Sequence, residues 1–149
     1  MISASVPFGA LLERMTQAIC RGDGAAAAAC FTADGTYHDG FYGEFRGREA
    51  IREMIEQRFH RDAREFVWNL ADVVSDGRVG YAHYDFSYVS KLPGAEGRRV
   101  GFAGISRCRL RNGLIERYDE AFDRGPVLVQ LGFAPERIAR SLARKPGTH

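Results

Sequence analysis

The first 60 residues carry the hydrophobic spacing of α-helices. Apolar residues recur at intervals of three and four at Phe8, Leu11, Leu12, Met15 and Ile19, a pattern typical of an amphipathic helix. We expect this helix to end near Gly22, and a short alanine-rich helix to follow over residues 24–31 with Asp23 as its N-cap. A third helix is predicted over residues 48–60, and an aromatic-rich strand over residues 36–42 precedes it.

After residue 64 the spacing changes to a period of two. Apolar and polar residues alternate over four predicted strands, at residues 65–75, 78–89, 98–111 and 114–123. Tight turns at "SDGR" and "RNG" and a longer one at "KLPGAEGR" join them, so consecutive strands should pair antiparallel as a meander. Helices followed by a meander predict an α+β fold, in which helices cover one face of a curved antiparallel sheet.

The length of the chain favours one domain. Its 149 residues are 45% hydrophobic, which is enough to bury a core, and we find no linker or internal repeat that divides them. We therefore expect a single domain over residues 1–149. Its core should span about residues 8–133, and a helical extension over residues 134–149 should open with Pro135 as a first helical residue.

Charge and cysteine content argue against several functional classes. Lys and Arg number 21 and Asp and Glu number 19, giving a net charge of +2, far from the basic excess of a dedicated nucleic-acid-binding domain. No apolar run approaches the roughly 18 residues that span a membrane. Cys20, Cys30 and Cys108 are spaced neither as a zinc motif nor as a disulfide framework. We expect a cytoplasmic protein that binds neither nucleic acid nor membrane and holds no metal.

The alternation assigns aromatic and acidic side chains to the inner face of the sheet. In the second and third strands of the meander the inward set is Ala82, Tyr84, Phe86, Tyr88, Val100, Phe102, Gly104, Ser106, Cys108 and Leu110. In the last strand two phases compete, and we favour the one with Tyr118, Glu120 and Phe122 inside. Buried phenols and carboxylates cost free energy without partners, so these residues predict a pocket with polar groups on its wall. His38 and His83 fall on the outer face.

Several short motifs in this arrangement resemble a known family. They are two N-terminal helices with "RGD" between them, "FTADGTYHD", "GREAIREM" at the start of the third helix, the four-stranded meander, and "GLIERYDEAFD" in the last strand. Together they resemble the SnoaL-like and ketosteroid isomerase-like members of the nuclear transport factor two superfamily. The resemblance implies a cystatin-like α+β roll, a cone of curved sheet with helices against it and a pocket at its mouth. The superfamily hosts isomerases, cyclases, dehydratases, epoxide hydrolases and proteins without known catalysis.

The resemblance also implies roles for individual residues. It puts the general-base aspartate of the isomerases on Asp39. The positions of their oxyanion-binding tyrosine and of their proton-donating aspartic acid fall on Met15 and Ser106. This departure argues against steroid isomerisation, because an enolate needs hydrogen-bond donors where its charge develops.

A second acidic group is implied by the resemblance to polyketide cyclases. Their acidic residue near the end of the last strand falls on Phe122 or Asp123, and Glu120 lies one inward step earlier. We expect Asp39 and Glu120 to be the catalytic residues. The expected substrate-binding residues are Met15 and the inward aromatic residues Tyr37, Trp68, Tyr84, Phe86, Phe102, Tyr118 and Phe122.

Two functions remain open for this pocket. The first is a cofactor-independent isomerase, cyclase or lyase that uses Asp39 as general acid and base on a small hydrophobic or carbonyl-containing ligand. The second is a non-catalytic ligand-binding or dimerisation module, in which Asp39 only caps the turn at "DGFYG". In both cases we expect a homodimer through the outer sheet face. That face mixes aromatic, apolar and charged residues, namely Tyr81, His83, Asp85, Ile105, Arg107 and Arg109.

Overall fold

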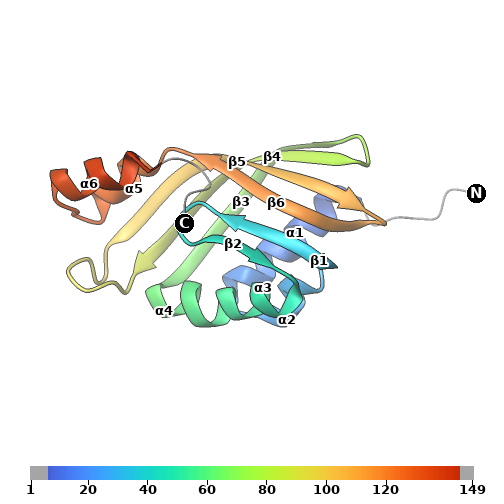
Figure 1. The fold of residues 1–149 in the computed structure, drawn as a ribbon, viewed down its shortest axis with the longest axis horizontal. Helices are drawn as coiled ribbons and strands as arrows, with labels where there is room; N and C mark the ends of the chain where they lie inside the picture. The colour runs from blue at the N-terminus through green and yellow to red at the C-terminus, as the bar shows by residue number, and fades with distance from the viewer. Residues whose placement is uncertain (1–6, 145–149) are drawn as a thin grey trace, which may run out of the picture.

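A six-stranded sheet with helices on one face forms the body of the protein (Figure 1). The structure is a computed structural model that describes residues 7–144. The strands lie in the order β2-β1-β6-β5-β4-β3. Their bounds are β1 Phe31–Asp39, β2 Gly43–Arg46, β3 Ala63–Ser75, β4 Val79–Ser90, β5 Arg99–Arg111 and β6 Leu114–Phe122. The α+β class predicted from the sequence is confirmed.

The N-terminal helices supply most of the hydrophobic core. Helix α1 (Phe8–Cys20) buries its apolar face as predicted, and Asp23 caps α2 (Gly24–Ala28) by accepting a 3.0 Å hydrogen bond from the amide of Ala26. Helix α3 (Arg48–Met54) continues through a π-helical turn, η1 (Ile55–Phe59), into α4 (His60–Asp62). The helix predicted over residues 48–60 therefore forms, but its C-terminal part contains a wider π-helical turn. Turns of this kind occur often at functional sites.

The start of the sheet differs from the prediction. Helix α2 ends at Ala28 and β1 begins at Phe31, five residues earlier than expected. The reason is tertiary: Phe31 is fully buried and pairs with Ile115 of β6, which outweighs the helical propensity of the alanine run. Strand β1 runs parallel to β6 and antiparallel to the short edge strand β2, and the period-two pattern revealed neither pairing.

The meander of β3 to β6 is antiparallel as predicted. A bulge in β6 explains why its alternation was ambiguous. Ile115 pairs with Leu110 while Arg117 pairs with Arg109, so Glu116 is an extra residue in the ladder. As a result both Ile115 and Tyr118 point inward and are fully buried.

The C-terminal segment folds against the open end of the sheet. Helix α6 (Pro135–Leu142) starts with proline as predicted, but α5 (Arg124–Gln130) was missed because Gly125 and Pro126 resemble a turn. Proline is compatible with a first helical turn, and Asp123 caps α5 by accepting a 3.0 Å hydrogen bond from the amide of Gly125. No helix among residues 7–144 combines the length and apolar character needed to cross a membrane.

Candidate functional site

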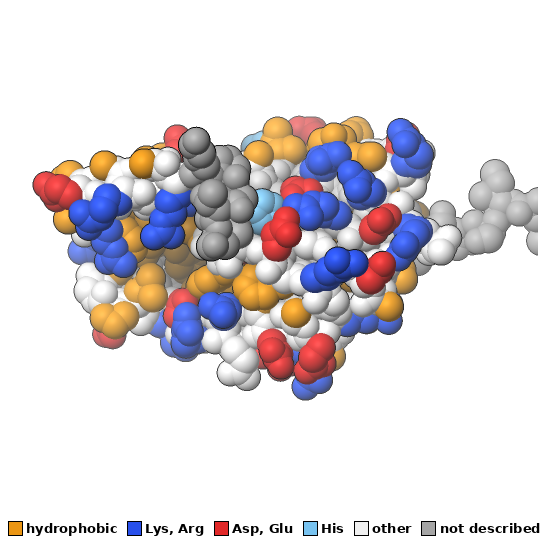
Figure 2. All heavy atoms as spheres, viewed as in Figure 1, with side chains coloured by type: hydrophobic (Ala, Val, Ile, Leu, Met, Phe, Trp, Pro, Cys, Tyr) orange, Lys and Arg blue, Asp and Glu red, His pale blue; other side chains and the backbone are white. Residues whose placement is uncertain are grey.

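A cavity of about 480 Å³ lies between the sheet, the η1 and α4 turns and the C-terminal helices. Figure 2 shows hydrophobic side chains inside a hollow below α5 and α6, with Lys and Arg side chains on its rim. Volumes of this size accommodate small organic ligands. The wall is largely aromatic, and two acidic side chains that the sequence singled out, Asp39 and Glu120, both line it.

Asp39 is the last residue of β1 and has two roles in the geometry. Its Oδ2 atom accepts hydrogen bonds of 2.8 Å from the amides of Phe41 and Tyr42, which closes the turn after the strand. Asp39 therefore does cap its own turn, as the non-catalytic alternative assumes. The side chain is also buried, at 6% exposure, and lines the cavity next to Glu120.

Glu120 reaches the same point from β6. Its Oε1 accepts a 3.1 Å hydrogen bond from the amide of Gly40, and its Oε2 lies 3.3 Å from the hydroxyl of Tyr118 and 3.5 Å from that of Tyr84. The last two distances are long for a hydroxyl donor. The Tyr84 hydroxyl is therefore only weakly engaged and can turn to a ligand.

The two neighbouring carboxyl groups both have a raised pKa. Burial raises the pKa of Asp39, while the two amide donors of its turn lower it in part. Burial, followed by the charge of Asp39, raises the pKa of Glu120 to about 8. With a pKa of about 8, Glu120 is mostly protonated at neutral pH and can donate a proton.

Tyrosine hydroxyls surround this pair as donors. Burial raises the pKa of both Tyr84 and Tyr118 above the usual range, so both stay protonated. The Tyr84 hydroxyl lies against Gly104, where any side chain would collide with it. The Tyr118 hydroxyl is 2.9 Å from Ser106 Oγ in the interior. Of these two phenols, Tyr84 lines the cavity and Tyr118 does not.

Aromatic rings shape the rest of the cavity for a flat apolar body. The ring centroids of Trp68 and Phe86 are 5.2 Å apart and those of Phe86 and Phe102 are 5.3 Å apart. Trp68 Nε1 is inaccessible and has no hydrogen-bond partner within the described residues. The indole therefore contributes its ring, and not its N–H group, to the wall.

Most of the expected substrate-binding residues line the cavity, and three do not. Those on the wall are Tyr37, Trp68, Tyr84, Phe86 and Phe102. Met15 is fully buried in the core because α1 packs its whole apolar face inward. Tyr118 is covered by Tyr37, whose ring stacks on it at 4.6 Å, and Phe122 backs Phe102 at 4.4 Å. These three side chains therefore lie behind the cavity wall.

Sequence reasoning missed other parts of the wall. Phe59 of the π turn and the pair of Tyr42 and Asp62, joined by a 2.6 Å hydrogen bond, line the cavity. Arg124, Arg137 and further arginines line it from the C-terminal segment. These residues lie at the end of a helix and in the C-terminal segment, where no period-two pattern marks which side chains point inward. His38 lies on the outer side as expected, with Nδ1 3.2 Å from Asp119.

Within residues 7–144 no three His, Cys, Asp or Glu side chains are grouped so that they could hold a metal ion. The groups present at the cavity can accept, donate and hold protons. What they offer a ligand is acid–base chemistry next to an apolar wall.

Comparison with solved structures identifies the fold. A hypothetical protein with a ketosteroid isomerase-like fold from Catenulispora acidiphila matches with a TM-score of 0.74 at 20% identity, covering 88% of this chain and 97% of that one. TsrD from Streptomyces laurentii matches with a TM-score of 0.72 at 25% identity, covering 90% and 99%. A candidate polyketide cyclase from Xanthomonas campestris matches with a TM-score of 0.68 at 23% identity, covering 83% and 95%.

The sequence comparison identifies the family. The SnoaL-like domain profile matches residues 12–118, which is more than half of the chain. The protein therefore belongs to the SnoaL-like domain family, as the motifs predicted. No curated protein matches the chain significantly.

Proposed function

We propose that this protein is a cofactor-independent acid–base catalyst that enolises a small, largely apolar carbonyl compound, as an isomerase, cyclase or lyase does. The observation that carries the proposal is the pair of carboxyl groups of Asp39 and Glu120, both with a raised pKa, on the wall of an aromatic cavity. We infer that the pair shares one proton at neutral pH, held by Glu120, and that Asp39 is the carboxylate. Buried carboxyl pairs with separated proton affinities are typical of sites that need an acid and a base at the same pH. The polyketide cyclase-like neighbour is consistent with this class of chemistry.

The roles follow from the protonation states. Asp39, as the carboxylate, takes a proton from the carbon next to the ligand carbonyl, and the C–H electron pair becomes the C=C bond of an enol. Glu120 gives its proton to the carbonyl oxygen, and the Tyr84 hydroxyl stabilises charge on that oxygen. The Tyr84 hydroxyl takes the place of the oxyanion-binding tyrosine of the isomerases, whose position is occupied by Met15 in this chain.

The second half of the reaction restores both groups. If the proton on Asp39 goes to another carbon and the enol proton returns to Glu120, the result is isomerisation. If the enol carbon bonds to a second carbonyl, that oxygen takes the proton from Asp39, the enol proton returns to Glu120 as the first C=O re-forms, and the product is a ring. If a leaving group on the next carbon departs with its electron pair and the proton of Asp39, the enol proton again returns to Glu120 as C=O re-forms, and the reaction is an elimination.

Deuterium exchange tests the proposal before the substrate is identified. In D₂O the wild-type protein should accelerate exchange at the carbon next to the carbonyl of 1-tetralone or 2-acetylnaphthalene, measured by mass spectrometry. Asp39→Asn should abolish the acceleration. Asp76→Asn is the matched control, because Asp76 also accepts two amides of its turn, at 2.8 and 2.9 Å, but in an exposed loop.

Two results would count against catalysis. Exchange no faster than in buffer for any ketone that binds would favour the alternative, a module that only binds its ligand. Equal acceleration by wild type and Asp39→Asn would remove Asp39 from the mechanism.

We also propose that the outer face of the sheet forms a homodimer. Tyr81 and Ile105 are 43% and 50% exposed on adjacent strands, and Val67 is 44% exposed on the next. Apolar side chains with charged neighbours such as Arg107 suit a self-complementary contact.

A further inference from the structure

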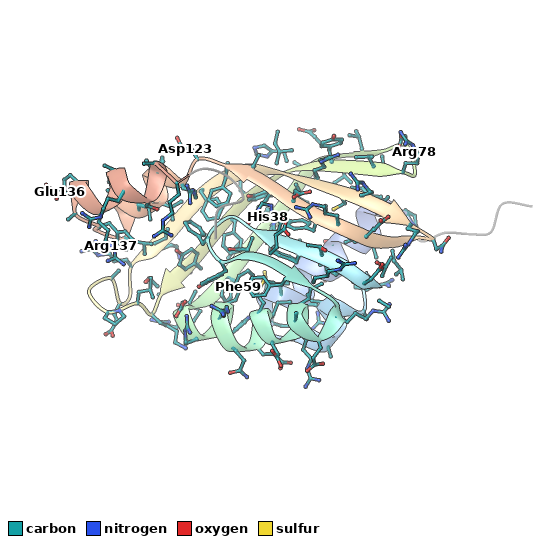
Figure 3. The ribbon with its side chains drawn as sticks, in the orientation of Figure 1. His38, Phe59, Arg78, Asp123, Glu136 and Arg137 are labelled. Atoms are coloured by element: carbon teal, nitrogen blue, oxygen red, sulfur yellow. The ribbon has the colours of Figure 1, made fainter. Side chains whose placement is uncertain are left out.

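Four arginines from the C-terminal segment lie at one side of the cavity. Arg124 belongs to α5, Arg137 and Arg140 belong to α6, and Arg144 follows it. All four line the cavity, together with apolar residues of the same segment. In Figure 3 Glu136 lies at the outer end of α6, whereas Arg137 lies on the side of the helix toward the body of the protein.

Within the described part of the chain, no carboxylate neutralises the charges of these arginines. Among residues 7–144 no Asp or Glu oxygen lies within 4.0 Å of any of the four guanidinium groups, in contrast to Arg61 and Arg117, whose partners lie at 2.7 Å. The acidic side chains on the same wall are already engaged. Asp62 is held by Arg61 and by the Tyr42 hydroxyl.

Two of the four side chains are held in place by neighbours. The guanidinium group of Arg137 stacks over the ring of Phe133 at 4.0 Å, and Arg124 donates a 3.3 Å hydrogen bond to the carbonyl of Ser141. Stacking and a carbonyl contact fix the planar groups while leaving further N–H donors free. A positioned guanidinium group is suited to a bidentate contact with a carboxylate or phosphate.

The cavity that the arginines share with the carboxyl pair has a largely apolar wall. Leu128, Leu131 and Phe133 come from the C-terminal segment, and Phe102 and Tyr88 face them from the sheet. A ligand that touches both ends of this cavity needs a flat apolar body and an anionic group at one end. Mutual repulsion of the four cations would be relieved by that anion.

We propose that the four arginines form an anion subsite, and that the ligand of this cavity is an apolar, ring-containing carboxylate or phosphate. The identification of that ligand as a substrate with a carbonyl group rests on the proposed function, but the binding of the anion does not. The subsite fixes which end of the ligand stays at the C-terminal helices and which end meets Asp39 and Glu120.

Fluorescence of Trp68 provides the binding test, since it is the single tryptophan of the chain and lies on the cavity wall. The probes are anthracene-2-carboxylate and its neutral isostere anthracene-2-carboxamide, with 2-naphthyl phosphate and 2-naphthoate to rank the two anions. At low ionic strength the carboxylate should bind at least about 10-fold more tightly than the amide. The difference should shrink as KCl is raised, because salt screens exposed charges.

Variants locate the effect at the C-terminal helices. The double variant Arg137→Gln and Arg140→Gln should weaken binding of the carboxylate about 10-fold and leave binding of the amide unchanged. Both side chains are exposed, so the fold should tolerate the change. Arg78→Gln removes a charge at the opposite end of the molecule (Figure 3) and should change neither affinity.

The outcomes separate this inference from the proposed function. Equal affinity for carboxylate and amide, or equal losses in the double variant, would overturn the anion subsite while leaving the exchange test of Asp39 intact. Failure of every probe to bind would overturn the assignment of the cavity itself. Anion-selective binding without any deuterium exchange would support the subsite and reject the catalytic proposal.

Discussion

Replacing Asp39 by Asn separates its role in the turn from its role as a base. The carboxylate accepts two amide hydrogen bonds of 2.8 Å, and bonds to a charged acceptor contribute about 1.5–3 kcal/mol each against about 0.5–1.5 for a neutral one. The amide oxygen of Asn keeps both contacts in weaker form. The change also removes a buried charge, whose desolvation opposes folding.

These opposing effects should leave the free energy of unfolding lowered by only about 1 kcal/mol, which corresponds to a Tm shift of about 2–4 °C for a chain of this length. Turnover should fall by about 100-fold or more, because general-base catalysis contributes about that much. Binding of anthracene-2-carboxylate, followed by Trp68 fluorescence, should stay within about threefold of wild type.

The matched variant Asp76→Asn gives the effect of losing a turn-capping carboxylate alone. It should lower Tm by a similar amount and leave deuterium exchange unchanged. If Asp39→Asn lowers Tm by more than about 10 °C, or if exchange survives in it, Asp39 is a structural residue and the reasoning fails.

Three further predictions address the rest of the site and the outer face. The pKa of Glu120 is raised to about 8 in the folded protein, so the free energy of unfolding of the wild type should fall as pH rises from about 5 to 8, by up to about 1.4 kcal/mol per pH unit. Urea unfolding should show this slope, and Glu120→Gln should flatten it. An unchanged slope in the variant would contradict the assignment. Gly104→Ala would displace the Tyr84 hydroxyl, so exchange should fall about 10-fold with a stability loss of about 1–3 kcal/mol, and full activity would exclude Tyr84 as donor. Light scattering at tens of micromolar, a rough range for such contacts, should show a dimer that Ile105→Glu dissociates, and a wild-type monomer would contradict the proposed interface.

Local pattern was enough to predict the meander, since strand faces follow directly from period-two alternation. The inward side of β4 and β5 was therefore readable, and with it Tyr84 and Phe102. The parallel pairing of β1 with β6 was not readable, because Phe31 and Ile115 are far apart in the chain and the contact is purely tertiary.

The candidate site was predictable in part. Asp39 came from the family motif, and Glu120 depended on the phase of a strand that the bulge at Glu116 disturbs. That the two carboxyl groups meet is a consequence of the turn at Gly40, whose amide contacts Glu120. The arginines of the C-terminal segment follow no periodic pattern, so only the folded chain shows that they share a cavity with the carboxyl pair.

Asp39 and Glu120 should share one proton at neutral pH, held by Glu120. A ¹³C NMR titration of the side-chain carboxyl groups measures this directly, with the Glu120 resonance assigned by its loss in Glu120→Gln. Glu120 should titrate near pH 8, and its pKa should fall in Asp39→Asn, where the neighbouring charge is gone. A Glu120 resonance that titrates near its ordinary value of 4.5, unaffected by Asp39→Asn, would contradict the account.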